Sequence, residues 1–388
     1  MELIDREQCT GCCACAAACP VSCMKFDFDD LGNRYPVIDA AGCIECGRCV
    51  RVCPEQGQLE FREIRQAYAV WSLDPERRKK SASGGAAAEF YREAIDQGYL
   101  VCGVGYSKEF HAVHVLTDDA DQAEEFQQSK YVYSEMAGIY EEIKRALEDQ
   151  KKVLFISLPC KAAGLKTWLR RDYENLLTVD IVCHGTPPYH LLREHIEAVA
   201  DLPPGSRLSF REDNEFRFCL RDDSGRTIYS KIGRTDPYLA AFLEGLDYRE
   251  SCYQCRYARP ERISDLTICD FWGLGTELPF EHPYTGSVSA VLINSDKGKV
   301  FFEQCRDRFF AEERPVAEAV RGNDQLNKPS AKHPARKAFE EKYRGMGFEQ
   351  AVKACLKEEI ACEQKAVRKR TIRSGLRSAA GVFLSRYR

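Results

Sequence analysis

The first part of the chain carries one cysteine pattern twice, and the pattern has the spacing of iron–sulfur ligands. Each copy has three cysteines at every third position, a fourth cysteine four positions later, and then a proline. The first copy runs from Cys9 to Pro20 and the second from Cys43 to Pro54. Bacterial proteins use this spacing to hold two 4Fe–4S cubanes. The spacing therefore predicts single-electron chemistry.

Two ligand sets follow from the way this pattern wraps a cubane. A loop with a cysteine at every third residue reaches three iron corners, and the fourth ligand comes from the other copy. The expected sets are Cys9, Cys12, Cys15 and Cys53 for one cluster, and Cys43, Cys46, Cys49 and Cys19 for the other. Pro20 and Pro54 should turn the chain after each fourth cysteine, because proline disfavours helix at the residue before it. Cys13 and Cys23 are extra, and Cys13 is expected to pack rather than bind iron.

Other uses of these cysteines fit the pattern less well. Zinc sites more often use two CxxC pairs or Cys/His mixtures with a longer gap. Disulfide scaffolds occur in small secreted chains, and no charged-then-apolar leader follows Met1. The chain has 20 cysteines, and those outside the front module show no obvious disulfide framework. We expect a reducing cytoplasm and an anaerobic host.

A second group of cysteines lies in the body of the chain. Cys160 and Cys183 each follow a predicted strand, and Cys252-x2-Cys255 lies in a loop rich in Tyr and Arg. Ligands of an open α/β sheet bind beyond the carboxyl ends of its strands. The spacing alone leaves three interpretations open: a third cubane, a zinc site or plain packing. The remaining cysteines expected to be small buried hydrophobes are Cys102, Cys219 and Cys305.

The segment Ser83-Gly84-Gly85 opens a predicted helix. Backbone N–H groups at a helix start, with glycines that allow close approach, suit a phosphate group. The same residues also fit a plain helix cap with a tight turn, which is the commoner use of such a segment.

Composition bounds the class of protein that must position these residues. The chain has 388 residues, enough for two or three domains, and 44% of them are hydrophobic. No apolar run approaches 18 residues, so we expect no membrane span. A formal net charge of -4 gives no electrostatic footprint for nucleic acid.

Strands alternate with helices along the body, which predicts an α/β sheet. The Met24–Asp39 segment reads as two short strands around a turn, Arg207–Ile232 as an antiparallel patch, and Glu76–Lys80 as a connecting loop. The expected strands are Gln66–Leu73, Tyr99–Tyr106, Ala112–Thr117, Lys152–Leu158, Leu176–Cys183, Leu266–Trp272 and Val288–Asn294. The expected helices are Ala86–Gln97, Met136–Asp149, Lys161–Arg170, Asp236–Leu246, Lys297–Phe310 and the chain from about Lys337 onward.

The end of the chain is basic. After Glu363 there are eight Lys or Arg residues and no acid. Apolar residues at helical spacing predict a basic amphipathic helix there, which could lie on an anionic membrane or an acidic partner. A solvated terminal helix is the simpler interpretation, because Gly375 and Gly381 weaken the helix.

Several short motifs occur in one order and carry a resemblance. They are Ser83-Gly84-Gly85, Ser129-Lys130-Tyr131, Pro159-Cys160, Cys183-His184-Gly185, Cys252-Tyr253-x-Cys255 and Ser264-Asp265-x3-Cys269-Asp270-Phe271-Trp272-Gly273. This order resembles the family of coenzyme F420 hydrogenase/dehydrogenase beta subunits over roughly residues 1–345. Two departures are Lys161, where the family often has Gln, and Cys269, where it often has Gly.

The resemblance implies an α+β or α/β fold in four parts. A small bacterial ferredoxin-like domain with two 4Fe–4S clusters spans residues 1–62. Two parts of a mixed α/β flavin-binding body follow at 63–150 and 151–345, and a helical basic tail covers 346–388. The resemblance also implies FAD and an additional 4Fe–4S cluster held by Cys160, Cys183, Cys252 and Cys255. Its implied FAD contacts are Ser83, Gly84, Gly85, Ser129, Lys130, Tyr131, Asp270 and Trp272.

These implications predict an electron relay in the cytoplasm. A flavin can trade single electrons with clusters and hydride with an organic partner, so it stands between the two. The organic partner would be F420-like or another conjugated molecule, in some relatives within polysaccharide synthesis, and an external electron carrier or redox protein would supply or take electrons. Lys130 is the candidate for stabilising reduced flavin, and His184 for donating a proton. Two rival interpretations are an electron-transfer subunit without its own organic substrate and a non-redox accessory protein stapled by clusters.

Overall fold

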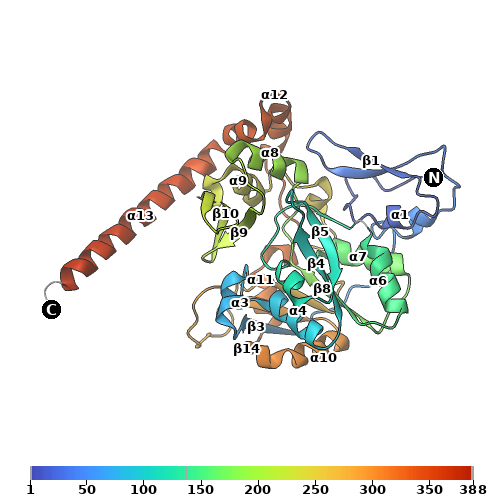
Figure 1. Ribbon diagram of the computed structural model, residues 1–388, viewed down its shortest axis with the longest axis horizontal. Helices are drawn as coiled ribbons and strands as arrows, with labels where there is room; N and C mark the ends of the chain where they lie inside the picture. Colours follow the sequence, from blue (N-terminus) through green and yellow to red (C-terminus); the bar gives the residue numbers. More distant parts are fainter. Residues whose placement is uncertain (1, 137, 386–388) are drawn as a thin grey trace.

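The computed structural model describes residues 2–136 and 138–385. Its body is built on a nine-stranded mixed sheet with the strand order β14-β3-β13-β12-β8-β7-β4-β5-β6 (Figure 1). The strands are β3 (Gln66–Ser72), β4 (Leu100–Tyr106), β5 (Ala112–Thr117), β6 (Ser134–Glu135), β7 (Val153–Ser157), β8 (Leu176–Ile181), β12 (Leu266–Asp270), β13 (Ser289–Ile293) and β14 (Phe309–Arg314). The four central strands β12, β8, β7 and β4 are parallel, so their carboxyl ends meet at one edge of the sheet.

Helices cover both faces of this sheet. Leu154 and Ile156 of β7 pack toward one face with α4 (Ala86–Asp96) and α10 (Asp296–Gln304). Val153 and Phe155, which alternate with them, pack toward the other face with α6 (Ile139–Glu148) and α7 (Pro159–Leu169). α11 (Val316–Arg321) packs against β3, and α5 (Ala120–Glu124) against α4. The continuous apolar run of β7 is therefore explained by burial on both sides.

The front module lies against the α6 and α7 side of the body. It contains two one-turn helices, α1 (Ala14–Ala17) and α2 (Arg48–Arg51), and the antiparallel pair β1 (Met24–Phe28) and β2 (Arg34–Ile38). α1 contacts both α6 and α7. The apolar residues Ala14 and Val52 of the module join the same core as the two body helices. The module is thus fixed to the body by a shared core.

A second lobe carries a three-stranded antiparallel sheet, β9 (Arg207–Glu212), β10 (Glu215–Arg221) and β11 (Thr227–Ile232). It packs with α8 (Tyr189–Val199), α9 (Pro237–Leu243) and α12 (Arg336–Cys355). Buried His195 of α8 lies between two carboxylates, 3.1 Å from Asp236 Oδ2 and 2.5 Å from Glu349 Oε1. Burial alone would lower the pKa of His195, but these carboxylates raise it to about 9.

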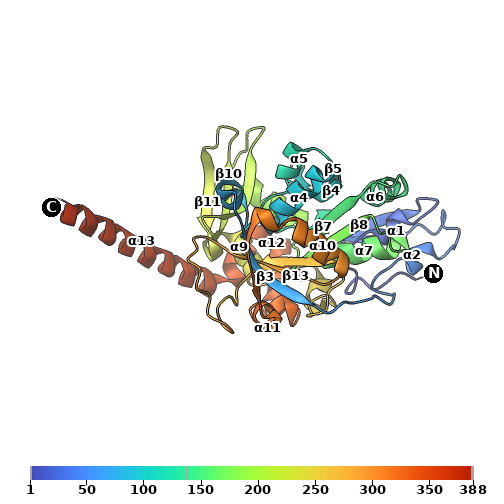
Figure 2. The same ribbon diagram turned by 90° about the horizontal axis from the view of Figure 1, so that it is seen from below.

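The last helix, α13 (Lys357–Ser385), projects from the body at the end opposite the front module (Figures 1 and 2). The expected continuous terminal helix is two helices, and α12 itself is kinked at Gly347, whose φ is 76°. Residues 386–388 of the predicted basic tail lie outside the described residues. Within the described residues, no helix is long and apolar enough to cross a membrane.

The expected elements of the sheet and its helices are confirmed, and two local expectations are wrong. The loop expected at Glu76–Lys80 is a helix, α3 (Pro75–Lys80), because Asp74 accepts bonds from the N–H groups of Glu76 and Arg77 and proline occupies the first turn. The helix expected to reach Phe310 ends at Gln304, and β14 begins at Phe309. Pairing of β14 with β3 outweighs the helical pattern there.

Candidate redox site

The two cysteine copies fold alike. The third cysteine of each copy lies in a one-turn helix, Cys15 in α1 and Cys49 in α2. The helix caps Cys13 and Gly47 are both left-handed, with φ of 65° and 70°. This conformation costs little at glycine and is uncommon for cysteine. The repeat seen in the sequence is therefore also a repeat of the backbone.

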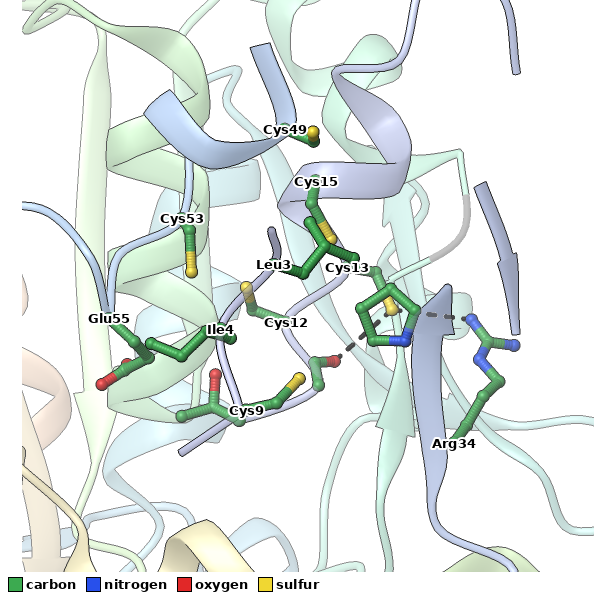
Figure 3. A pocket seen from close by; sticks show the side chains of 13 residues that line it. Leu3, Ile4, Cys9, Cys12, Cys13, Cys15, Arg34, Cys49, Cys53 and Glu55 are labelled. Atoms are coloured by element: carbon green, nitrogen blue, oxygen red, sulfur yellow. Dashed lines mark hydrogen bonds between the residues drawn. The ribbon is translucent and has the colours of Figure 1, made fainter. Parts of the chain in front are cut away.

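The first ligand set lines a hollow between the two one-turn helices (Figure 3). Figure 3 shows sulfur atoms of both copies directed into this inner hollow. Its cysteines are Cys9, Cys12, Cys13, Cys15, Cys49 and Cys53. Four of these are the cysteines expected to ligate one cubane. Cys13 points instead to Arg34, whose guanidinium donates to Cys13 Sγ over 3.5 Å.

The second ligand set lines an outer hollow beside β1 and β2. Its cysteines are Cys19, Cys23, Cys43, Cys46 and Cys49. Exposed Val21 and Ile44 also line it, and Ile44 is 61% exposed. Cys23, given no role from the sequence, has its Sγ 3.4 Å from Cys19 Sγ. Four thiols around one hollow are the donor set of a 4Fe–4S cluster, so the residues of both hollows fit that group.

The second group of cysteines converges at the carboxyl edge of the sheet. Cys160 lies in the first turn of α7 after β7, and Cys183 follows β8. Cys252 lies in the short turn Glu250–Gln254, and Cys255 follows it. Burial raises the pKa of all four thiols. The charges of the other three also raise the pKa of Cys160, which places the four within electrostatic range. Burial disfavours the thiolate form of such cysteines, and binding of a cation, as by ligands of a cluster, favours it.

Cys269 lies apart from this group. It is on β12, and the charges that act on it are those of Asp270, Arg262 and Asp180. Arg262 and Asp180 form a buried ion pair of 2.6 Å. The expected buried cysteines Cys102, Cys219 and Cys305 are all at most 1% exposed. Among the described residues, no three His, Cys, Asp or Glu side chains are close enough together to hold a single metal ion.

Buried side chains of the body hold the first cysteine loop. Arg249 donates from Nε to the Cys9 carbonyl over 2.5 Å and from a terminal nitrogen to Cys9 Sγ over 3.4 Å. Ser251, next to Cys252, donates to the same carbonyl over 3.0 Å. Tyr140 of α6 donates to the Cys12 carbonyl over 2.6 Å. The first cysteine loop, which lines the inner hollow, is therefore held by residues near the body cysteines, whereas the outer hollow is lined by residues of the front module alone.

A polar cluster begins one residue beyond Cys183. Arg211 of β9 donates to Asp270 Oδ2 over 3.3 Å and to the Tyr131 hydroxyl over 3.4 Å. Its guanidinium also lies 6.0 Å from the centre of the Trp272 ring. Burial lowers the pKa of His184, while the charge of Asp270 raises it. The structure thus brings these expected site residues together with Arg211, which no sequence motif indicated.

The cluster has unmet hydrogen-bonding capacity. None of the described residues hydrogen-bonds Asp270 Oδ1 or Arg211 Nε, although both atoms are buried. Trp272 is 56% exposed and offers a ring face. Unpaired buried polar atoms beside an exposed aromatic are what an organic cofactor would satisfy. The residues present therefore fit a bound flavin.

The other residues expected to contact the flavin make contacts of several different kinds within the protein. Lys130 donates from Nζ to the carbonyls of Gln127 over 2.7 Å and Glu125 over 3.1 Å, and burial lowers its pKa to about 7. Ser83 donates to the carbonyl of Val288 over 3.3 Å. A Cβ at Gly84 would lie 2.4 Å from the Val70 carbonyl, so close packing accounts for this glycine. Gly85 caps α4 with a φ of 95°. Burial raises the pKa of Tyr131, and Ser129 is among the groups that lower it.

Comparison with known proteins assigns the front module first. Residues 8–56 match a 4Fe-4S dicluster domain, and residues 35–90 match a second profile with the same description. The protein is therefore an iron–sulfur protein of the dicluster class. Residues 67–141 match the N-terminal profile, and residues 150–319 the C-terminal profile, of the beta subunit of coenzyme F420 hydrogenase/dehydrogenase. The chain belongs to the family of coenzyme F420 hydrogenase/dehydrogenase beta subunits.

Individual relatives share modest identity with this chain. One of the subunits of the F420H2 dehydrogenase of Methanosarcina mazei is 21% identical over 81% of this chain and 87% of its own. The coenzyme F420-dependent sulfite reductase of Methanocaldococcus jannaschii is 23% identical over 48% of this chain, which spans only 29% of that protein. A chain of the F420-reducing [NiFe] hydrogenase complex from Methanosarcina barkeri has a TM-score of 0.48 at 18% identity, covering 81% of this chain and 95% of its own.

Proposed function

We propose that this protein is an iron–sulfur flavoprotein oxidoreductase. It would relay electrons between an external carrier, ferredoxin-type 4Fe–4S clusters, FAD and an organic hydride partner that is F420-like or another conjugated molecule. When bound, the clusters would supply single-electron steps and the flavin would supply hydride exchange. The residues of this chain would hold these groups in order and tune them.

One observation supports the proposal most strongly. We infer that three groups of cysteines and one polar cluster form a series, from the contacts that join each of them to the next. The outer hollow is beside exposed Ile44, and the inner hollow contacts the body through Arg249. The body cysteines follow, and Cys183 is adjacent in sequence to His184 of the polar cluster. Such an order suits transport of electrons between the surface and a site for organic chemistry.

The cysteines would act as cluster ligands in three sets of four. The two front sets are those expected from the crossed pattern, and the third is Cys160, Cys183, Cys252 and Cys255. Hydrogen bonds to the sulfurs and burial of the site set the potential of such a cluster. Arg249 supplies one such bond to Cys9 Sγ.

The polar cluster would bind and orient the isoalloxazine ring. Arg211 and Asp270 offer a donor and an acceptor atom that the described residues leave unpaired, and Trp272 offers a stacking face. His184 would hold a ring N–H that hydrogen-bonds the flavin, since burial lowers the pKa of this imidazole and favours its neutral form. Lys130, with a pKa of about 7, would add a positive charge near reduced flavin.

Turnover by the isolated chain tests this proposal. The anaerobically reconstituted protein, given reduced viologen dye and oxidised F420, should reduce F420. The visible absorbance of F420 should then fall. A His184→Gln variant should slow this reaction while keeping its flavin. If clusters and flavin are bound and reduced yet the flavin passes hydride neither to F420 nor to any other conjugated acceptor tried, the assignment of an organic substrate is wrong.

A second candidate function is an electron-transfer subunit of a larger complex without its own organic substrate. The observation that favours it is the relative from Methanosarcina mazei, which is named as one of the subunits of an F420H2 dehydrogenase. In that case the complete relay would appear only after a catalytic partner is added. Co-purification of such a partner from anaerobic extracts would select this candidate.

A further inference from the structure

A buried lysine lies where the front module meets the body. Lys161 follows Cys160 at the start of α7 and is 1% exposed. Its Nζ donates to the Gly11 carbonyl over 2.7 Å, within the loop that carries the first ligand set. The ammonium also lies 4.1 Å from the centre of the Tyr133 ring, whose hydroxyl donates to the same Gly11 carbonyl. One side chain thus joins two cysteine groups that are far apart in sequence.

The charge of Lys161 has sulfur neighbours and no acidic partner. Burial and the charge of Arg249 lower the pKa of Lys161, and the groups that oppose this effect are the thiols of Cys13, Cys160 and Cys12. No ion pair within 4.0 Å joins it to any carboxylate of the described residues. A buried ammonium without a counter-charge is costly, so a fold that keeps one needs negative charge nearby. Clusters bound by thiolates on both sides would supply that charge.

We propose that Lys161 is a positioning residue that raises the reduction potentials of both the inner cluster and the body cluster. This inference rests on the proposed function. Each one-electron reduction adds one negative charge beside the ammonium, which stabilises the reduced state through space. The step is the transfer of one electron, and no bond forms or breaks. Each of the two clusters would receive its electron from the cofactor on one side in the relay and pass it to the cofactor on the other side.

The outer cluster serves as an internal reference. Its hollow is lined by residues of the front module alone, and Lys161 is not among them. A charge in the protein interior acts strongly on a near neighbour and weakly on a distant one. The reduction potentials of the inner cluster and the body cluster should therefore depend on Lys161, and that of the outer cluster should not.

A substitution that removes the charge but keeps a donor tests this inference. Lys161→Gln can still donate to the Gly11 carbonyl and restores the residue that the family often has. Lys161→Met removes both charge and donor, whereas Lys161→Arg keeps the charge. The matched control is Lys166→Gln on the same helix, whose Nζ donates to the Ile263 carbonyl over 2.5 Å. The charges that act most on Lys166 are those of Asp265, Arg62, Asp172 and Lys297.

The readout is an anaerobic redox titration of the holoprotein followed by electron paramagnetic resonance, with iron content measured on each sample. Lys161→Gln should disfavour reduction of two clusters about tenfold, or about 59 mV for one electron, and leave the third unchanged. Lys161→Arg and Lys166→Gln should keep all three potentials. If Lys161→Gln keeps its full iron content and its reduction potentials are unchanged, this inference is wrong but the proposed function stands. The same conclusion follows if both Lys161→Gln and Lys161→Met lose iron. Wild-type protein that lacks the body cluster overturns the proposed function and this inference with it.

Discussion

Two cysteines at the ends of neighbouring strands should behave in opposite ways when each is replaced by alanine. Cys183 follows β8 and belongs to the converging body group, whereas Cys269 lies on β12 beside the Arg262–Asp180 ion pair. Both thiols are buried enough for their pKa to be raised. The two sites therefore share strand-end position and burial but differ in sulfur neighbours.

The expected magnitude follows from the ligand sets. Cys183→Ala removes one of four ligands of the body cluster, so the protein should lose about four of about twelve irons. Cys269→Ala removes no ligand, so its iron content should equal that of the wild type. Its stability should fall by only about 1 kcal/mol, the common value for point substitutions.

Iron and acid-labile sulfide measured on anaerobically purified variants give the result, with thermal unfolding as the check on folding. Equal iron in both variants at the wild-type value would contradict the assignment of Cys183. Loss of iron in Cys269→Ala alone would show that this thiol, and not Cys183, completes the body cluster.

Three further predictions concern single sites. A Cβ at Gly164 would lie 2.9 Å from Cys12 Cβ. Gly164→Ala should therefore lower the free energy of unfolding by about 1–3 kcal/mol and alter the paramagnetic resonance signal of the inner cluster. An unchanged signal would contradict the close packing of the front module against α7. The folded pKa of His195 is raised from 6.5 to about 9, so its stabilising contribution is complete below pH 6.5 and is lost as pH rises to about 9. Asp236→Asn should flatten that dependence and cost about 3–5 kcal/mol at pH 6 by denaturant unfolding, and wild-type stability that is constant over this window contradicts the reasoning. Asp270→Asn should weaken FAD binding by about 1–3 kcal/mol in a fluorescence titration, and an unchanged Kd removes Asp270 from the flavin site.

Local patterns predicted much of the fold. The two cysteine copies and the strands of the parallel sheet are read from residues close in sequence, and the structure has them at nearly the expected bounds. The convergence of Cys160 and Cys183 followed from one topological rule, that parallel strands end at a common edge. The errors at α3 and β14 arose where a cap at Asp74 and a long-range strand pairing decided the outcome.

Contacts between segments that are far apart in the chain could not be predicted from the sequence. Arg249 reaches Cys9, 240 residues earlier, and Lys161 reaches Gly11, 150 residues earlier. A buried Arg or Lys has no local signature, because charged residues are mostly exposed and only the folded contact distinguishes the exceptions. No sequence pattern indicated Arg211 for the same reason, because its strand is an ordinary member of an antiparallel sheet.

The most direct test of the account is the cofactor content of protein purified without oxygen. Iron, acid-labile sulfide and flavin should be measured together on one sample. Three clusters and a flavin predict about twelve irons, about twelve sulfides and one FAD per chain. About eight irons without flavin would leave only the front clusters and contradict the relay, and colourless protein without iron would contradict the redox function itself.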